Sequence, residues 1–196
     1  MPISESKGAA ASDGELVQKA KEGSTSAFDA LVVKYRKKVY AIAFGMTRNH
    51  SDADDVAQET FFRAYRALSS FRPGYEFRPW LLRIAVNQSI NCLKRKGRRL
   101  EVSLEEEVGS GIVTDVQFDN PGYGLEQKEL AARIEAAVQR LSPKLRAVFL
   151  LRTGQDLSYE EMAKILRISK GTVMSRLSRA REKVKGMVGE YGENTE

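Results

Sequence analysis

The sequence predicts an all-α fold of two small helical domains joined by a long acidic linker. Three observations support this prediction: apolar residues recur at helical spacing, strand-like alternation is scarce, and one central stretch lacks a helical stripe. The expected helices span residues 13–22, 25–47, 52–70, 77–97, 126–141, 143–153, 158–166 and 170–187. A chain of 196 residues with 42% apolar residues can form one domain or two small ones.

Residues that commonly begin and end helices support these boundaries. Two serine–acid pairs fit the capping box at a helix start: Ser51 with Asp54, and Ser158 with Glu161. Further boundaries are marked by Ser142 followed by Pro143, and by Gly23 and Gly154. The two ends of the chain, residues 1–12 and 189–196, are expected to be disordered tails.

The composition excludes several classes of protein. No apolar run approaches the roughly 18 residues that span a bilayer, and residues 1–15 lack the apolar core of a secretory signal, so the expected compartment is the cytoplasm. Cys92 is the only cysteine and His50 the only histidine, which excludes an internal disulfide, a cysteine-based zinc site and a histidine-based triad. We expect Cys92 to be a small buried hydrophobe, and we expect no metal or cofactor.

The net charge of +6 is unevenly distributed. Residues 1–99 contain 18 Lys/Arg and 10 Asp/Glu, and residues 126–196 contain 14 and 10. Residues 100–125 contain six acids and no Lys or Arg. Two basic segments that flank an acidic one favour two modules that bind a polyanion, connected by a tether that does not.

Residues 157–185, LSYEEMAKILRISKGTVMSRLSRAREKVK, are typical of a helix-turn-helix. The first helix is expected to direct Met162, Ile165 and Leu166 inward. The short turn at 167–169 ends on Ser169, whose hydroxyl can cap the next helix. The second helix carries an apolar stripe that packs against the first: Val173, Leu177, Ala180 and Val184.

The rest of this second helix is polar and basic, as in a helix that enters the major groove of DNA. Ser and Thr suit bases or phosphate, and Arg paired with guanine is the commonest specific base contact. The candidate contacts to duplex DNA are Lys170, Thr172, Ser175, Arg176, Arg179 and Lys183. The alternatives are a solvated two-helix corner and a membrane-surface helix, although the latter lacks a Trp or Phe anchor.

Residues 71–99 form a second candidate site. Five polar residues at helical spacing make one stripe: Arg83, Asn87, Asn91, Lys94 and Arg98. Aromatic residues cluster just before it: Phe71, Tyr75, Phe77 and Trp80. Aromatic rings stack unpaired bases and cations neutralise phosphates, so this segment favours single-stranded nucleic acid. The alternative, which we favour for Phe77 and Trp80, is that the aromatic residues belong to the core.

The expected helix at 52–70 begins with an acidic cluster: Asp52, Asp54, Asp55 and Glu59. One interpretation is a metal-binding carboxylate cluster for nuclease chemistry, but the sequence offers no second set of ligands. Another is that acids are stabilised at the positive end of the helix dipole. A third is a surface that docks on another protein.

The sequence resembles bacterial RNA polymerase sigma factors of the extracytoplasmic function (ECF) group, similar to the sigma-E type. The resemblance covers roughly residues 13–187 and rests on collinear motifs: LVVKYRKKVY (31–40), DADDVAQETFFRAYRAL (52–68), the pattern F-R…F-x-x-W-L-x-R-I-A-x-N from Phe71, and LSYEEMAKILRISKGTVMSRLSRAREK (157–183). A helix-turn-helix alone would not be specific to this family.

The resemblance implies how the chain is divided and what it binds. It implies a sigma-2 domain at 13–97 that binds core polymerase and melts the −10 promoter element. It implies a linker at 98–125 that threads toward the RNA exit path, and a sigma-4 domain at 126–188 that recognises the −35 element. The implied partners are core RNA polymerase, through its β′ clamp helices and β flap, promoter DNA and an anti-sigma factor. No enzymatic activity and no direct membrane insertion are implied, although an anti-sigma factor can sequester such proteins at the inner membrane.

The resemblance also implies roles for individual residues. Those expected to dock on the β′ clamp helices are Asp54, Asp55, Gln58, Glu59, Phe62 and Arg63. Those expected at the melted −10 element are Asn87, at the pocket for a flipped base, with Asn91, Arg83, Lys94, Phe71, Tyr75 and Trp80. Relatives often carry a basic residue at the position of Met174 and an aromatic residue at that of Ser178, so we expect a different −35 preference.

Two other functions remain open from the residues alone. A stand-alone helix-turn-helix regulator would bind a palindromic site as a dimer, but it leaves the stripe at 83–98 unexplained. A helical adaptor that binds only proteins would show no salt-dependent binding to nucleic acid. Transcription in vitro by core polymerase, with and without this chain, separates the three functions.

Overall fold

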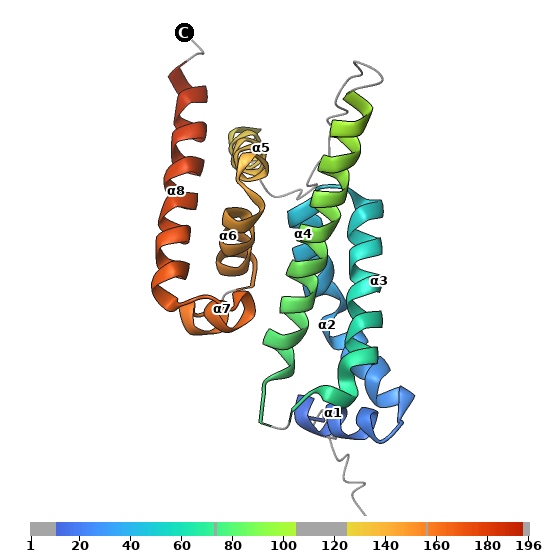
Figure 1. Ribbon diagram of the computed structural model, residues 1–196. Helices are drawn as coiled ribbons and strands as arrows, with labels where there is room; N and C mark the ends of the chain where they lie inside the picture. The colour runs from blue at the N-terminus through green and yellow to red at the C-terminus, as the bar shows by residue number, and fades with distance from the viewer. Residues whose placement is uncertain (1–10, 73, 105–124, 156, 194–196) are drawn as a thin grey trace, which may run out of the picture.

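The all-α prediction is confirmed by the computed structural model, which describes residues 11–72, 74–104, 125–155 and 157–193 (Figure 1). All regular structure in these ranges is helical. The helices are α1 (Asp13–Lys21), α2 (Thr25–Thr47), α3 (His50–Ala67), the 3-10 turn η1 (Leu68–Ser70), α4 (Phe77–Leu104), α5 (Leu125–Arg140), α6 (Pro143–Gln155), α7 (Tyr159–Leu166) and α8 (Lys170–Glu193). Each helix expected from the sequence has a counterpart.

The first domain is a bundle of α2, α3 and α4, with α1 across one end (Figure 1). Helix α2 buries residues at intervals of three and four, which keeps them on one side of the helix: Leu31, Tyr35, Val39, Ile42 and Met46. Helix α4 meets them with Leu81, Leu82, Ala85 and Val86, all buried. Because each fully buried Leu or Ile contributes about 1.5–3 kcal/mol, these stripes are the main stabilising feature of the bundle.

The predicted capping box at α7 is confirmed. The backbone N–H of Ser158 donates to Glu161 Oε2 at 2.8 Å, and the backbone N–H of Glu161 donates to Ser158 Oγ at 3.2 Å. A second capping box, which the sequence analysis did not single out, joins Ser12 and Glu15 at the start of α1. Pro143 is the first residue of α6, as predicted. Gly23, with a φ of 99°, lies just beyond the end of α1, also as predicted.

The predicted cap at Ser51 is wrong. Arg48 ends α2 in the left-handed conformation with a φ of 54°, which turns the chain so that the extended Asn49 becomes the N-cap of α3. The Oδ1 of Asn49 accepts a hydrogen bond from the backbone N–H of Asp52 at 2.9 Å. Ser51 therefore lies inside the first turn of α3.

Three helix ends also differ from expectation. Helix α4 continues to Leu104 because residues 98–104 contain neither Gly nor Pro, so the first part of the expected linker is helical. Helix α8 continues to Glu193, into the expected tail, and Gly154 lies within α6 instead of ending it. The acidic linker at 105–124 and residues 1–10 of the expected N-terminal tail lie outside the described residues.

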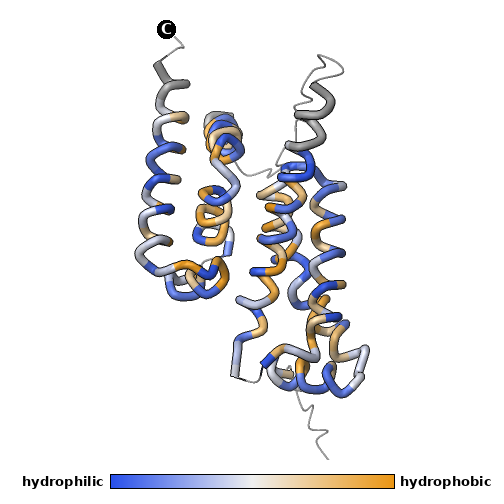
Figure 2. Tube along the Cα trace, in the orientation of Figure 1, coloured by the Kyte–Doolittle hydropathy of each residue, from blue (hydrophilic) through white to orange (hydrophobic). Residues whose placement is uncertain are grey.

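The second domain contains the predicted helix-turn-helix, formed by α7 and α8, with α5 and α6 packed against α8. The predicted inward residues Met162 and Ile165 of α7 are buried, as are Val173, Leu177 and Ala180 of α8. Leu166, also predicted to face inward, is half-buried against the same core. Figure 2 shows that the remainder of α8 is mainly hydrophilic, which leaves one long polar surface on this helix.

The two domains pack against each other, with α6 beside α2 and α7 beside α4. A single buried cluster includes Ile42 and Met46 of the first domain and Val148, Leu151 and Met162 of the second. The charge pattern predicted two modules on a tether, but it did not predict that the modules share a core.

Candidate nucleic-acid interface

The predicted polar stripe lies on one face of α4. Asn87, Asn91 and Lys94 are exposed and Arg83 is half-buried. The residues between them turn to the interior: Leu82, Ala85, Val86, Ser89 and Cys92 are buried, as predicted for the cysteine. Arg98 lies farther along α4, and its side chain is outside the described residues. Two amides and one cation are thus available to a partner on the same helical face.

Arg83 and Arg167 bring positive charge from both domains to one place. Arg167 ends α7 in the left-handed conformation with a φ of 52°. Burial lowers the pKa of Arg83 below its ordinary value, and the positive charge of Arg167 lowers this pKa further. The two side chains are therefore close enough for their positive charges to repel.

The aromatic cluster divides into core and surface. Phe77 is buried, and its ring centroid lies 5.5 Å from that of the half-buried Trp80. Phe71 is also buried, and its ring centroid lies 5.0 Å from that of Trp80. Tyr75, by contrast, is 68% exposed in the loop before α4. The core interpretation therefore holds for Phe77, whereas Tyr75 is the ring of this cluster that is most available for stacking.

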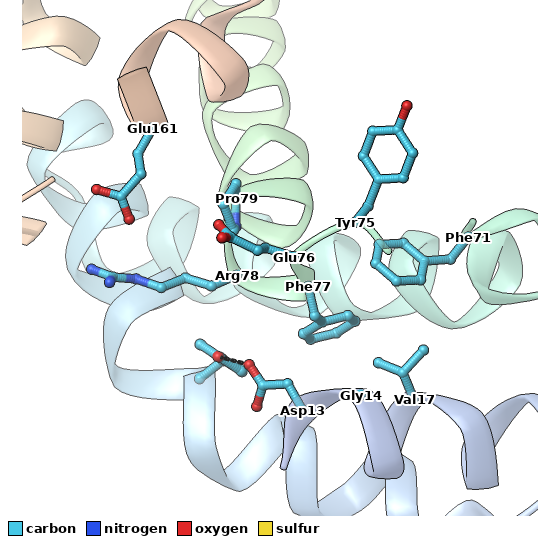
Figure 3. Close-up of a pocket in the computed structure, with 11 residues that line it drawn as sticks. Asp13, Gly14, Val17, Phe71, Tyr75, Glu76, Phe77, Arg78, Pro79 and Glu161 are labelled. Atoms are coloured by element: carbon cyan, nitrogen blue, oxygen red, sulfur yellow. Dashed lines mark hydrogen bonds between the residues drawn. The ribbon is translucent and has the colours of Figure 1, made fainter. Parts of the chain in front are cut away.

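A cavity of about 450 Å³ lies beside these rings, between α1, the loop before α4 and the start of α7 (Figure 3). Its aromatic lining is formed by Tyr35, Phe71, Tyr75 and Phe77, and its charged lining by Asp13, Glu76, Arg78 and Glu161. The hydroxyl of Tyr35 donates to the carboxylate of Asp13. The pKa of Tyr35 is raised above its ordinary value, mainly by burial and to a lesser extent by this hydrogen bond. The cavity is thus lined by both aromatic rings and charged side chains.

The predicted polymerase-docking residues lie on the outer face of α3. Asp54, Asp55, Gln58, Phe62 and Arg63 are exposed, and Glu59 is half-buried and paired with Arg63 at 2.5 Å. Phe62 is 56% exposed, with the guanidinium of Arg66 5.6 Å from its ring centroid. The inner face of α3 is buried through Ala53, Val56, Thr60 and Ala64. This outer face combines acids, arginines and an exposed aromatic ring, a combination that suits binding to a protein.

The candidate duplex contacts lie on the outer face of α8. Lys170, Ser175, Arg179 and Lys183 are exposed, and Thr172 and Arg176 are half-buried. The hydroxyl of Ser169 accepts a hydrogen bond from the backbone N–H of Thr172 at 3.1 Å and so caps the helix, as predicted. Lys170 is paired with Glu160 of α7. Met174 interrupts this polar face with an apolar side chain that is 50% exposed.

Comparison with known proteins decides the family. Models of Sigma-70 region 2 and Sigma-70 region 4 match residues 31–99 and 124–184. The RNA polymerase sigma-H factor of Pseudomonas aeruginosa is 37% identical over 88% of this chain and 91% of that protein. The ECF RNA polymerase sigma-E factor of Escherichia coli (strain K12) is 37% identical over 90% of this chain and 94% of that protein. The chain belongs to the ECF sigma factors.

Solved structures of sigma factors share the fold. CnrH, solved in complex with the cytosolic domain of CnrY, matches with a TM-score of 0.67 and 27% identity over 91% of this chain and 97% of that chain. RpoE of Bartonella quintana, solved in complex with the anti-sigma factor NepR, matches with a TM-score of 0.65 and 25% identity over 83% and 96%. The family and function expected from the resemblance are confirmed: this ECF sigma factor binds core RNA polymerase and directs it to promoters. No helix in the described part of the chain is long and apolar enough to cross a membrane.

Several structurally important residues were not identified from the sequence. Arg146 is buried, with a relative exposure of 7%, and it donates hydrogen bonds to carbonyls in both domains. Gly45 lies where α2 meets α6, and Asp13 lines the cavity. These residues come together through contacts between distant segments, and local spacing carries no signal for them.

Proposed function

We propose that the exposed face of α4 and the loop before it bind the unpaired strand of the −10 element. The observation that carries this proposal is the exposure of Asn87 and Asn91 on one face with Lys94. Asn is a poor helix former and these two amides are not buried, so they contribute little to the stability of the helix. Amides can bond to the edges of flipped bases, and a cation on the same face can neutralise phosphate.

The loop residues complete this −10 site. Tyr75 offers an exposed ring on which a base can stack, and stacking on an aromatic side chain contributes about 1–3 kcal/mol per base. Phe71 and Trp80 support the loop from the core side, and Arg83 supplies a further cation at the base of the stripe. We assign these residues with residues 13–97 to the sigma-2 domain.

The N-terminal half of α8 is proposed to read the −35 element in the major groove. Its buried stripe fixes α8 against α7, so that Ser175, Arg176 and Arg179 point away from the domain core. Thr172, Lys170 and Lys183 lie along the same outer surface, where hydroxyl and ammonium groups suit phosphates. We assign residues 126–188 to the sigma-4 domain and residues 98–125 to the linker.

The outer face of α3 is proposed to dock on the β′ clamp helices, and the second domain on the β flap. Exposed Phe62 supplies the apolar centre of the α3 face, with Asp54, Asp55, Gln58 and the Glu59–Arg63 pair around it. Burial of an aromatic ring within a polar rim is typical of protein interfaces.

Further proposals follow from the family. The sigma factor acts in the cytoplasm without catalysis of its own, since capture of unpaired bases needs no bond to be broken. CnrH and RpoE were solved with partner proteins, in the second case an anti-sigma factor, and we propose an anti-sigma partner for this chain that can hold it at the inner membrane.

Transcription in vitro tests the proposal. Core RNA polymerase and a template with an ECF-type promoter are incubated with and without this chain, and promoter-specific transcripts are measured. We expect transcripts only when the chain is present. Binding of a palindromic duplex without polymerase, and no transcripts, would instead support the stand-alone regulator.

A further inference from the structure

We propose that Lys21 of α1 is a positioning residue of the −10 site, which fixes the loop that carries Tyr75. The proposal rests on the proposed function of α4 and this loop in binding the unpaired strand. The loop joins η1 to α4, and the structure describes it at residues 71–72 and 74–76. Lys21 precedes Phe71 by 50 residues, so local spacing in the sequence does not connect it with the loop.

The ammonium group of Lys21 donates a hydrogen bond to the backbone carbonyl of Phe71 at 3.0 Å. Phe71 has two further attachments. Its backbone N–H donates to the carbonyl of Leu68 at 3.0 Å and so ends η1, and its buried ring packs against Trp80. The carbonyl of Phe71 follows the last residue of η1, where regular structure offers it no donor. Lys21 supplies this donor from another helix.

The carbonyl of Phe71 sets the direction in which the chain leaves the core. This carbonyl and the N–H of Arg72 belong to one planar peptide group, so a donor that holds the carbonyl also orients Arg72. The chain then turns: Gly74 has a φ of 83°, and the backbone N–H of Tyr75 donates to the carbonyl of Arg72 at 3.4 Å. Tyr75 is 68% exposed at the end of this turn. Rotation of the Phe71 peptide group would therefore move the ring of Tyr75.

Helix α1 is itself held in place and can therefore support the loop. Its first turn is fixed by a capping box, and Val17 and Ala20 are buried in the same core cluster as Phe71. Figure 3 shows Val17 directed toward the ring of Phe71, whereas Tyr75 points away from α1. Because Ala20 is buried, the side chain of Lys21 starts beside the core and ends on the loop.

A second lysine of α1 provides a comparison. Lys19 is exposed and lies two residues before Lys21, which places it about 200° around the helix axis. The pKa of Glu15 is lowered mainly by hydrogen bonds from Ser12 and to a lesser extent by the positive charge of Lys19, so this lysine lies near Glu15. The two lysines carry the same charge on the same helix, and of the two it is Lys21 that is bonded to the loop.

A loop that is fixed in advance lowers the entropic cost of binding the strand. When the turn is held before the strand arrives, the ring of Tyr75 does not have to be ordered at the moment of binding. Loss of the Lys21 hydrogen bond should therefore weaken binding of the unpaired strand about three- to tenfold. Polymerase binding should not change, because the proposed docking face lies on α3 and does not include α1.

Binding of the non-template −10 strand to the holoenzyme tests the proposal. The holoenzyme is assembled from core polymerase and the full chain. The probe is a single-stranded oligonucleotide from the promoter used for transcription, with 2-aminopurine at one −10 position at a time. We expect Lys21→Met to bind about three- to tenfold more weakly than the wild type, and to raise the fluorescence of the 2-aminopurine that stacks on Tyr75. Lys21→Arg keeps a charged donor and should bind within about twofold of the wild type. Lys19→Met, the matched control, should bind as the wild type does.

A double-variant cycle separates positioning from a general loss of charge or stability. Because Lys21 acts through the loop, Lys21→Met should weaken binding in the wild type but not in Tyr75→Ala. Equal losses in the two backgrounds would overturn the proposal, as would equal binding by Lys21→Met and wild type, or equal losses in Lys21→Met and Lys19→Met. Circular dichroism checks the fold of each variant, and Lys21→Ala replaces Lys21→Met if the latter does not fold, since alanine is the best helix former. Binding by Tyr75→Ala as tight as that of the wild type would instead count against the proposed −10 site.

Discussion

Arg146 Nη1 donates to the backbone carbonyl of Met46 at 2.5 Å, and so a side chain of α6 completes a helix of the other domain. The same guanidinium donates to the carbonyls of Val138 at 3.2 Å and Leu141 at 3.2 Å, and also to that of Gln139, at the junction of α5 and α6. Burial lowers the pKa of Arg146 below its ordinary value. One buried cation thus organises the fold of the second domain and its contact with the first.

Replacement of Arg146 by Met is expected to lower the free energy of unfolding by about 2–3 kcal/mol. Met fills similar volume but leaves buried carbonyls without donors, and hydrogen bonds from charged donors contribute about 1.5–3 kcal/mol. Urea denaturation followed by circular dichroism measures the change. Arg133→Met is the control, since Arg133 is exposed and its carboxylate partner, Glu129, lies 3.9 Å away on the same helix. A similar loss in both variants would contradict the special role of Arg146.

The capping box of α7 should make stability depend on pH. The backbone N–H and hydroxyl of Ser158 hold the pKa of Glu161 below its ordinary value of 4.5. A carboxyl whose pKa is lower in the folded state stabilises the fold above its ordinary pKa, and this contribution is lost as the pH falls through the folded-state value. Near neutral pH, the wild type should therefore have a higher free energy of unfolding than Glu161→Gln. This difference in free energy should become smaller as the pH falls.

A coupled variant isolates this effect. In the Ser158→Ala background the carboxylate loses the hydroxyl partner, so Glu161→Gln should change the pH dependence less than it does in the wild type. The measurement is urea denaturation at about pH 6 and about pH 3, on either side of the ordinary pKa. The same pH dependence in both backgrounds would show that the Ser158 hydroxyl is not its source.

Replacement of Asn87 by Ala is expected to impair promoter melting while polymerase binding stays unchanged. The amide is exposed on α4, far in sequence from the proposed docking face on α3, and alanine is the better helix former, so the fold should not suffer. Permanganate footprinting of open complexes measures melting, and gel filtration with core polymerase measures binding. Gln88→Ala, at the half-buried neighbouring position, is the control. Equal open-complex formation by Asn87→Ala and wild type would count against the assignment.

Replacement of Arg179 by Ala is expected to weaken −35-dependent binding by about 1–3 kcal/mol if the contact to guanine is bidentate. Arg179 is exposed on α8, next to buried Ala180 and one turn beyond Ser175, so its loss removes a contact without opening the core. Competition among templates with altered −35 bases measures discrimination. Lys185→Ala, exposed farther along α8, removes one positive charge as the control. Unchanged discrimination by Arg179→Ala would contradict the assignment.

Local patterns predicted the helices and the exposed faces, but not the way the domains meet. The stripe from Val173 to Ala180 on α8 follows from 3.6-residue periodicity, and its burial was predictable for that reason. The helix start at His50 was missed because Arg48 adopts a left-handed conformation that only its surroundings specify. From the sequence, Arg146 is one more cation on an amphipathic helix, since its contact with the first domain is made through the carbonyl of Met46, which is distant in the sequence.

Met174 is expected to set one base preference in the −35 element. Its thioether side chain is 50% exposed on the reading face of α8 and can contact a thymine methyl group, but it cannot donate a hydrogen bond to guanine. Met174→Arg should therefore shift one −35 position toward guanine, by roughly 1–3 kcal/mol of discrimination. Binding to templates that carry each base in turn measures the shift. Met174→Leu keeps an apolar side chain of similar size and should keep the wild-type preference. The same base preference in Met174→Arg as in wild type would remove Met174 from the reading surface.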